Sequence, residues 1–236
     1  MVKMTMVSGQ RQERVMLLEQ VYELLKEQII DRVYGPGDKL NIDAIAREMK
    51  VSSTPVREAL ARLVAEGLVA AVPYVGFAVS PMPTRKYYED LYTFRNLLEP
   101  WAAAEAARWR PSDVIDEIKA AVEAMSEYGL SNKYRRHRSF AVADHDFHHA
   151  VVKASGNKVA EKSFLDLKVH LHLSRLYLNS RQPVDKKQTE QRGILLVERT
   201  REEHQKILNA ILEGDPDRAA EAMREHLNVS KRKLID

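Results

Sequence analysis

The sequence contains no cysteine, and this absence removes several classes of site at once. Disulfides, cysteine-based zinc sites and thiol nucleophiles are excluded, so any bound metal must be held by histidine and carboxylate side chains. Long apolar runs are also absent, because no stretch approaches the roughly 18 residues that a membrane span requires. The N-terminus lacks the apolar core of a signal peptide. We therefore expect a cytoplasmic protein with no membrane partner.

A large excess of charge of one sign is missing as well. The formal net charge is only +3, and residues 1–80 hold ten Lys and Arg against ten Asp and Glu, a difference of zero. Bulk charge thus gives little indication of nucleic-acid binding, which must depend on where individual arginines lie. The length of 236 residues is sufficient for two domains with sizeable cores.

Residues 1–80 have the pattern of a winged helix-turn-helix. After a loose arm at 1–12, the apolar periodicity predicts three helices, at about 15–32, 42–49 and 54–66, the last two joined by a tight turn. Two short apolar runs, 68–72 and 77–79, then flank a Pro/Gly turn and predict a small β-hairpin, the wing. This order of elements is typical of a domain that binds double-stranded DNA.

Two arginines lie on the outward face of the third predicted helix. Arg57 and Arg62 are placed to meet phosphates or guanine edges in a major groove. The alternative is that they only form ion pairs with Glu58 and Glu66 on the same helix. Helix-turn-helix proteins read paired half-sites, so we expect a homodimer.

Residues 81–84 are expected to form a linker, because two prolines stiffen this short connector. Beyond it, residues 85–236 show only helical periods separated by single breaks, and they predict an all-α bundle. We expect six helices, of which the fourth ends at Arg181-Gln182-Pro183 and carries the apolar residues Phe164, Leu165, Leu171, Leu173, Leu176 and Leu178. The fold class is therefore mainly α, with an N-terminal winged helix-turn-helix and a C-terminal helical bundle.

A set of inward-facing polar residues in the bundle predicts a metal site. Asp144 and His148 are four residues apart on one helix face, which they share with apolar side chains. His204 lies ten residues before Gly214 and His226 twelve after it, so an antiparallel hairpin would bring them to one level. One carboxylate and three imidazoles suit a divalent transition metal, zinc first, with nickel, manganese or iron as alternatives. The other interpretation is a set of satisfied core histidines.

The N-terminal sequence resembles the GntR family of bacterial transcription regulators. The resemblance is carried by Thr54-Pro55-Val56-Arg57-Glu58-Ala59-Leu60 and Glu66-Gly67-Leu68-Val69, and it implies that Arg57 contacts DNA and that Gly76 shapes the wing tip. The chain departs from the family pattern in three places: the family usually has Gly at Lys50, Arg at Ser53 and often a basic residue at Val75. The expected DNA-contact set is Lys50, Ser53, Thr54, Arg57, Arg62 and Gly76.

The C-terminal sequence resembles the FCD domain, the ligand-binding domain of the FadR subfamily of these regulators. The matching features are Arg95-x-x-Leu98-Glu99, Asp144-x-x-Phe147-His148, Ser155-Gly156-Asn157, Glu203-His204, Gly214-Asp215-Pro216 and Glu225-His226-Leu227. The resemblance implies that the effector is a small organic acid. It also implies that Arg95 binds the carboxylate of this acid beside the metal. Arg175 is a second candidate for that role, and an Arg95–Glu99 surface ion pair is the alternative for Arg95.

These features together predict a transcription repressor whose operator binding is controlled by a carboxylate metabolite. Two other functions remain open from the sequence: a metal-dependent hydrolase built on a helical bundle, and a regulator whose metal is purely structural. Motifs of metal-dependent enzymes are missing: the Glu-x-x-His of di-iron bundles does not occur at His204 or His226, which follow Arg201 and Met223 by three residues, and no His-Glu-x-x-His is present.

Overall fold

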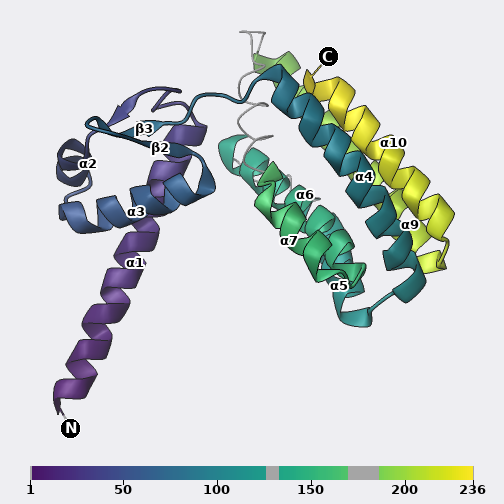
Figure 1. The fold of residues 1–236 in the computed structure, drawn as a ribbon, viewed down its shortest axis with the longest axis horizontal. Helices are drawn as coiled ribbons and strands as arrows, with labels where there is room; N and C mark the ends of the chain where they lie inside the picture. The colour runs from purple at the N-terminus through teal and green to yellow at the C-terminus, as the bar shows by residue number, and fades with distance from the viewer. Residues whose placement is uncertain (1, 126–132, 170–185, 236) are drawn as a thin grey trace. The chain divides into compact units, whose positions relative to one another are not determined.

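The computed structural model describes residues 2–125, 133–169 and 186–235, with side chains described for 15–125, 139–169 and 197–233. The chain divides into two compact units between Met82 and Pro83. This division falls inside the linker expected at 81–84. Figure 1 shows the winged unit in purple and blue and the helical unit in teal to yellow.

The first unit combines three helices with a small sheet. The helices are α1 (Val2–Ile30), α2 (Ile42–Glu48) and α3 (Ser53–Glu66), and the strands are β1 (Lys39–Leu40), β2 (Val69–Val72) and β3 (Gly76–Val79). The strands pair antiparallel in the order β1-β3-β2, with Val69 opposite Val79 and Leu40 opposite Phe77. The described elements therefore form the expected winged helix-turn-helix.

Helix α1 packs against α3 through one apolar face. Val21, Tyr22, Leu25 and Ile29 repeat at helical spacing, and all are at most 4% exposed. They meet the buried face of α3, formed by Val56, Ala59, Leu60 and Leu63. This packing fixes α3, the second helix of the helix-turn-helix, within its unit.

The turn between α2 and α3 contains a residue in a strained backbone conformation. Lys50 has φ +55°, in the left-handed region that side chains other than glycine enter at a cost. The turn needs this conformation, because the chain must change direction between Met49, the C-cap of α2, and Ser52, the N-cap of α3. Lys50 is the position at which the GntR pattern described above usually has glycine.

Two features of the first unit differ from the sequence-based prediction. The segment 1–12 was expected as a loose arm, but its described part, 2–12, is helical, since α1 begins at Val2. It contains no proline, and a helix that is already nucleated extends at little cost per residue. Strand β1 was not predicted, because two residues are too short to show an alternating pattern.

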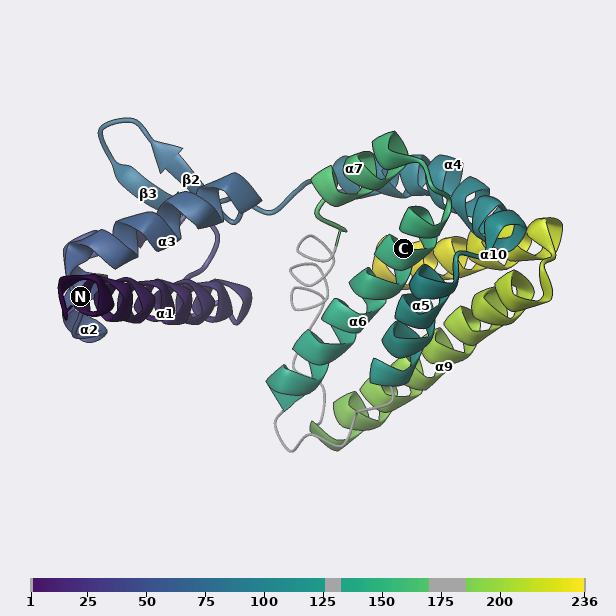
Figure 2. The same cartoon turned by 90° about the horizontal axis from the view of Figure 1, so that it is seen from below.

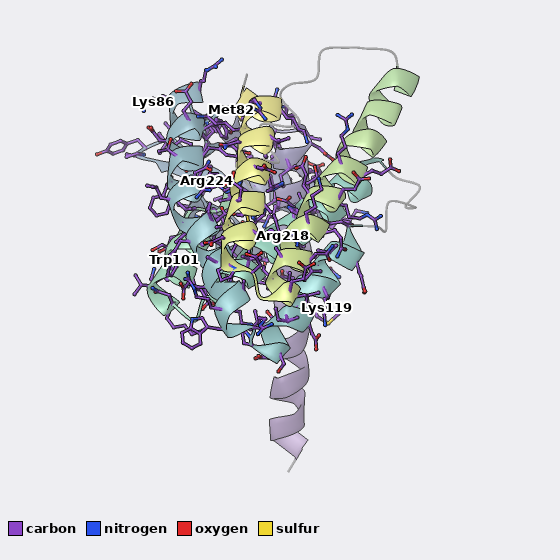
Figure 3. All side chains as sticks on the ribbon, turned by 90° about the vertical axis from the view of Figure 1, so that its right-hand side faces the viewer. Met82, Lys86, Trp101, Lys119, Arg218 and Arg224 are labelled. Atoms are coloured by element: carbon purple, nitrogen blue, oxygen red, sulfur yellow. The ribbon has the colours of Figure 1, made fainter. Side chains whose placement is uncertain are left out.

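The second unit is a helical bundle. Its described helices are α4 (Arg85–Trp109), α5 (Ser112–Ala124), α6 (Lys133–Ala154), α7 (Lys158–Asp166), α9 (Lys186–Glu213) and α10 (Pro216–Ile235). Helices α4 and α10 run side by side, and Figure 3 shows Lys86 and Trp101 along α4 and Arg224 and Arg218 along α10. Helix α10 also packs on α9, and α6 packs on α4 and α5 (Figure 2). These contacts place α4, α6, α9 and α10 around one shared interior.

The turn between α9 and α10 is closed by a contact from the end of α4. Gly214 has φ +71°, and a Cβ atom at this position would lie 2.7 Å from the guanidinium Nη1 of Arg110. A larger residue would therefore be strained in its backbone and would also displace Arg110. The turn fixes the register of the α9–α10 hairpin, and this register decides which residues of the two helices face each other.

The fourth predicted helix is interrupted in the structure. Helix α7 ends at Asp166, and Lys168 has φ +48°, which cannot continue a right-handed helix. The later part of that prediction, 171–178, lies outside the described residues.

None of the helices in the described ranges combines the length and apolarity that a membrane crossing requires.

Candidate metal centre

Four polar side chains from three helices converge inside the second unit. Asp144 and His148 come from α6, His204 from α9 and His226 from α10. One candidate ligand atom from each residue lies within 4.8 Å of the other three. All three histidines are at most 4% exposed. The tertiary structure thus brings together the four residues that the sequence pattern selected.

The distances between the donor atoms are those of ligands around one ion. His226 Nε2 lies 3.2 Å from both His204 Nε2 and His148 Nε2. Asp144 Oδ1 lies 3.6 Å from His204 Nε2 and 4.0 Å from His148 Nε2. Nitrogens that bind one zinc ion tetrahedrally at about 2.0–2.1 Å are about 3.3 Å apart. The four side chains therefore fit a single divalent metal.

The opposite ring nitrogens of the histidines meet acceptors from other parts of the bundle. His226 Nδ1 hydrogen-bonds Glu203 Oε2 at 2.8 Å, and His204 Nδ1 lies 3.1 Å from the sulfur of Met125. His148 Nδ1 lies 2.6 Å from Glu99 Oε2, an ion-pair contact rather than an aligned hydrogen bond. A carboxylate beside Nδ1 favours the proton on that nitrogen and leaves the lone pair on Nε2. Converging Nε2 lone pairs suit a cation at their centre.

Burial favours the neutral form that metal binding needs in two of these imidazoles, His204 and His226. The pKa of His204 is lowered well below its usual value, first by burial and then by the neighbouring His226, His148 and Arg95. Burial also lowers the pKa of His226, against the opposing effect of its hydrogen bond to Glu203. Because ligation requires a deprotonated nitrogen, the site is prepared for metal at neutral pH.

Arg95 of α4 lies beside this cluster and is buried, with 1% of its surface exposed. Its Nε and Nη2 atoms bond both carboxylate oxygens of Glu99, at 2.5 and 3.2 Å. The Arg95–Glu99 pair considered in the sequence is therefore present, but it lies in the interior and not at the surface. Glu99 links Arg95 to the candidate ligands, because its Oε2 atom lies 3.2 Å from Arg95 Nη2 and 2.6 Å from His148 Nδ1. Arg175 lies outside the described residues.

The predicted DNA contacts occupy the α2–α3 turn, the start of α3 and the wing. Lys50, Thr54 and Gly76 are exposed, and Ser53, the first residue of α3, is half-buried. Arg57 is exposed and forms no ion pair with any described residue. Arg57 is thus available to a partner of opposite charge.

Arg62 has partners within its own unit. Its Nη1 atom lies 2.7 Å from Glu19 Oε2, and its guanidinium carbon lies 3.7 Å from the centre of the Tyr22 ring. Both partners belong to α1, so Arg62 ties α1 to α3. The alternative considered from the sequence, a pair with Glu66, is not the contact found, since Glu66 instead meets Tyr22 and Lys26.

Sequence reasoning did not assign three residues that contact the candidate ligands. Glu99 and Glu203 belong to the motifs that carry the family resemblance, but each contacts a histidine of another helix. Glu99 contacts His148, and Glu203 contacts His226. Met125 is the C-terminal cap of α5, and nothing in its sequence context indicates a histidine partner 79 residues away. Adjacency of Glu203 to His204 is misleading, because successive helical residues face different directions and Glu203 contacts His226.

Comparison with known proteins agrees with both units. The FCD domain family matches residues 90–229, and the family described as bacterial regulatory proteins, gntR family, matches residues 17–79. The chain is similar to a probable D-xylose utilization operon transcriptional repressor of Paenarthrobacter nicotinovorans, with 26% identity over 93% of this chain and 89% of the relative. It is 29% identical to the HTH-type transcriptional regulator LutR of Bacillus subtilis, over 81% of this chain and 89% of that one.

A solved structure shares the fold at lower sequence identity. Escherichia coli McbR/YncC superposes with a TM-score of 0.64 and 21% identity, covering 92% of this chain and 96% of the other. This likeness supports the fold class, a winged helix-turn-helix followed by a helical bundle.

Proposed function

Because the chain belongs to the bacterial GntR family of regulators that carry an FCD domain, we propose that it is a metabolite-responsive transcription repressor. Its winged helix-turn-helix binds DNA as those of the family do, and relatives named as repressors include those of Paenarthrobacter nicotinovorans and Escherichia coli. A small carboxylate, bound beside a divalent metal in the helical unit, would control operator binding. The observation that carries this proposal is the convergence of Asp144 and three histidines next to the buried Arg95.

The family assignment makes the chain a transcription regulator rather than an enzyme. The relatives with which it shares most of its length are transcription regulators. This assignment excludes the hydrolase considered from the sequence. The metal site then has a role in sensing or in stability.

In the DNA-binding unit, Arg57 is the side chain that we propose to meet the operator. It is exposed on α3, and its charge is not used by another described residue. Lys50, Ser53, Thr54 and Gly76 would support this contact from the turn, the start of α3 and the wing. Arg62 would act indirectly, because its pairing with Glu19 and Tyr22 of α1 holds α3 in place. A homodimer would present two such units to paired half-sites.

In the helical unit, Asp144, His148, His204 and His226 would hold the metal. Zinc fits the three imidazoles and one carboxylate, and nickel, manganese or iron would also accept this set. A bound divalent ion would supply positive charge and a coordination position for a carboxylate oxygen of the effector. Arg95 would bind a second oxygen of the effector, since a guanidinium forks onto a carboxylate.

The proposal is tested with the purified full-length protein and DNA from upstream of its own gene. We expect elemental analysis to find about one divalent metal per chain, and a gel shift to show a specific complex. Some mono- or dicarboxylate should both raise the melting temperature and release the DNA. A protein that forms no specific complex in the presence or absence of any carboxylate would overturn the proposal.

The second candidate, a regulator with a purely structural metal, is favoured by one observation. Arg95 is already paired with a carboxylate of the chain, Glu99, in a buried bidentate contact. If the metal only ties α6, α9 and α10 together, its removal should lower the melting temperature, and no carboxylate should change DNA binding.

A further inference from the structure

Glu99 stands between the two parts of the proposed effector site. It lies on α4 and is fully buried, with 0% of its surface exposed. One carboxylate oxygen, Oε1, meets Arg95 Nε, while Oε2 is shared between Arg95 Nη2 at 3.2 Å and His148 Nδ1 at 2.6 Å. A single carboxylate therefore touches both the arginine and a candidate metal ligand.

The geometry of this contact is that of a carboxylate held by a guanidinium. Two nitrogens of Arg95 meet the two oxygens of Glu99 in a buried, forked arrangement. The pKa of Arg95 is raised by the same carboxylate, in spite of burial. Glu99 thus presents to Arg95 a charged, planar, bidentate group, which is the chemistry that an organic acid would offer.

We propose that Glu99 is an internal competitor for the effector: its carboxylate occupies Arg95 until an incoming carboxylate displaces it. This inference rests on the proposed function, because it concerns how the same site is regulated. Two carboxylates that share one guanidinium repel each other, so effector binding must break at least part of the Arg95–Glu99 contact. The competition lowers the apparent affinity for effector and sets the concentration at which the regulator responds.

The position of Glu99 makes the exchange feasible without movement of the backbone. Arg95 and Glu99 are four residues apart on one helix, so rotation of the Glu99 side chain alone can separate them. Oε2 already lies 2.6 Å from His148 Nδ1, so a Glu99 side chain that turned about this oxygen would keep a contact that favours the His148 tautomer with its lone pair at the metal centre. Displacement of the Glu99 carboxylate therefore links binding of the effector at Arg95 to His148, the candidate metal ligand of α6.

The test compares Glu99→Gln with Glu203→Gln in the zinc-saturated full-length protein. Both variants remove a carboxylate from beside the Nδ1 atom of a candidate ligand, but only Glu99 also contacts Arg95. Acetate and succinate are titrated as probes by calorimetry, and zinc affinity is measured separately by competition with a chromophoric chelator. Both variants should bind zinc roughly 10- to 100-fold more weakly, as is usual when the partner of a ligand histidine is lost.

The two variants should differ in their response to carboxylates. Glu99→Gln should bind acetate or succinate about tenfold more tightly than the wild type, because a released charge-assisted hydrogen bond corresponds to at least a factor of this size. Glu203→Gln should show no such gain, because Glu203 does not contact Arg95. The double variant Arg95→Gln/Glu99→Gln should lose the gain. Equal behaviour of the two single variants, or weaker carboxylate binding by Glu99→Gln, would overturn the inference.

A third variant covers the case in which Glu99→Gln does not fold. Glu99→Asp keeps the charge but is one methylene shorter, so it cannot span Arg95 and His148 together, and a smaller gain in the same direction is expected. No gain in this variant overturns the inference as well. If the wild type releases DNA with a carboxylate but neither variant gains affinity, only the competition is wrong. If the wild type binds neither zinc nor any carboxylate, the proposed function fails with it.

Discussion

His204 and His226 are 22 residues apart in the chain, and their Nε2 atoms lie 3.2 Å from each other. They come from the two arms of the α9–α10 hairpin, ten residues before and twelve residues after Gly214. Nearly equal arms bring the two side chains to the same level, where His148 of α6 completes the group of three imidazoles. The hairpin turn therefore determines the geometry of the candidate metal centre.

Replacement of His204 should remove metal binding without a general effect on α6. We expect His204→Ala to weaken zinc affinity by more than the roughly 100-fold that loss of an outer partner can cause, since a ligand itself is removed. His149→Ala is the matched control, because His149 adjoins His148 on α6 but contacts Glu161 at 3.3 Å instead of the cluster. Competition with a chromophoric chelator measures both. Similar zinc affinities for the two variants would contradict the proposed ligand set.

The metal-free protein should lose stability as the pH falls below about 6.5. Burial lowers the pKa of His204 and of His226 in the folded state, so at acidic pH the unfolded chain binds more protons than the folded one. The stability is fully present above the unfolded pKa of about 6.5 and decreases as the pH falls. For each histidine, a roughly tenfold difference in proton affinity between the folded and unfolded chains corresponds to about 1.4 kcal/mol. Urea unfolding of chelator-treated protein between about pH 7.5 and pH 5 measures this slope.

A variant separates this effect from general acid denaturation. His204→Phe keeps an aromatic ring against Phe147, whose ring centre lies 4.1 Å from that of His204, but it cannot be protonated. The slope should therefore be shallower in His204→Phe than in the wild type. An unchanged slope would assign the acid sensitivity to other groups.

Loss of Arg57 should weaken DNA binding, whereas loss of Arg62 should mainly affect stability. If Arg57 contacts a phosphate, Arg57→Ala should lower affinity for all sequences and reduce the salt slope by about 1. Arg62→Ala removes an exposed ion pair with Glu19 and the cation–π contact with Tyr22, together up to about 1–2 kcal/mol of stability. Binding titrations over a range of salt and urea unfolding distinguish the two. A reduced salt slope for Arg62→Ala would make Arg62 a direct contact.

Replacement of Lys50 by glycine tests the strained turn. Because Lys50 has φ +55°, Lys50→Gly should relieve about 1 kcal/mol of backbone strain, partly offset by the greater freedom of glycine in the unfolded chain. We expect stability to be unchanged or slightly higher and DNA affinity to fall if Lys50 contacts a phosphate. Arg47→Gly, in the last turn of α2, is the control and should destabilise by about 1 kcal/mol. Equal losses in both variants would show that the turn is not strained.

Much of the fold could be predicted because its signals are local. Helical periodicity and single breaks located α4, α5, α6, α9 and α10, since an amphipathic helix repeats its apolar face along the sequence. The break at Lys168 was missed, because a single residue with positive φ leaves no mark on an apolar pattern. The extension of α1 through 2–12 was missed because a polar segment shows no buried face, although it can still continue a helix.

The sequence by itself determined the two-unit organisation and the four candidate metal ligands, because helical spacing and the distances from Gly214 already put those side chains on inward faces. Only the tertiary structure decided their partners. The packing of α4 against α6 decided that Glu99 contacts His148 as well as Arg95. The packing of α1 against α3 decided that Arg62 meets Glu19 and not Glu66. Charged side chains pair with whatever group packing brings within a few ångströms, and for Glu99 and Arg62 one such group comes from another helix far away in the sequence.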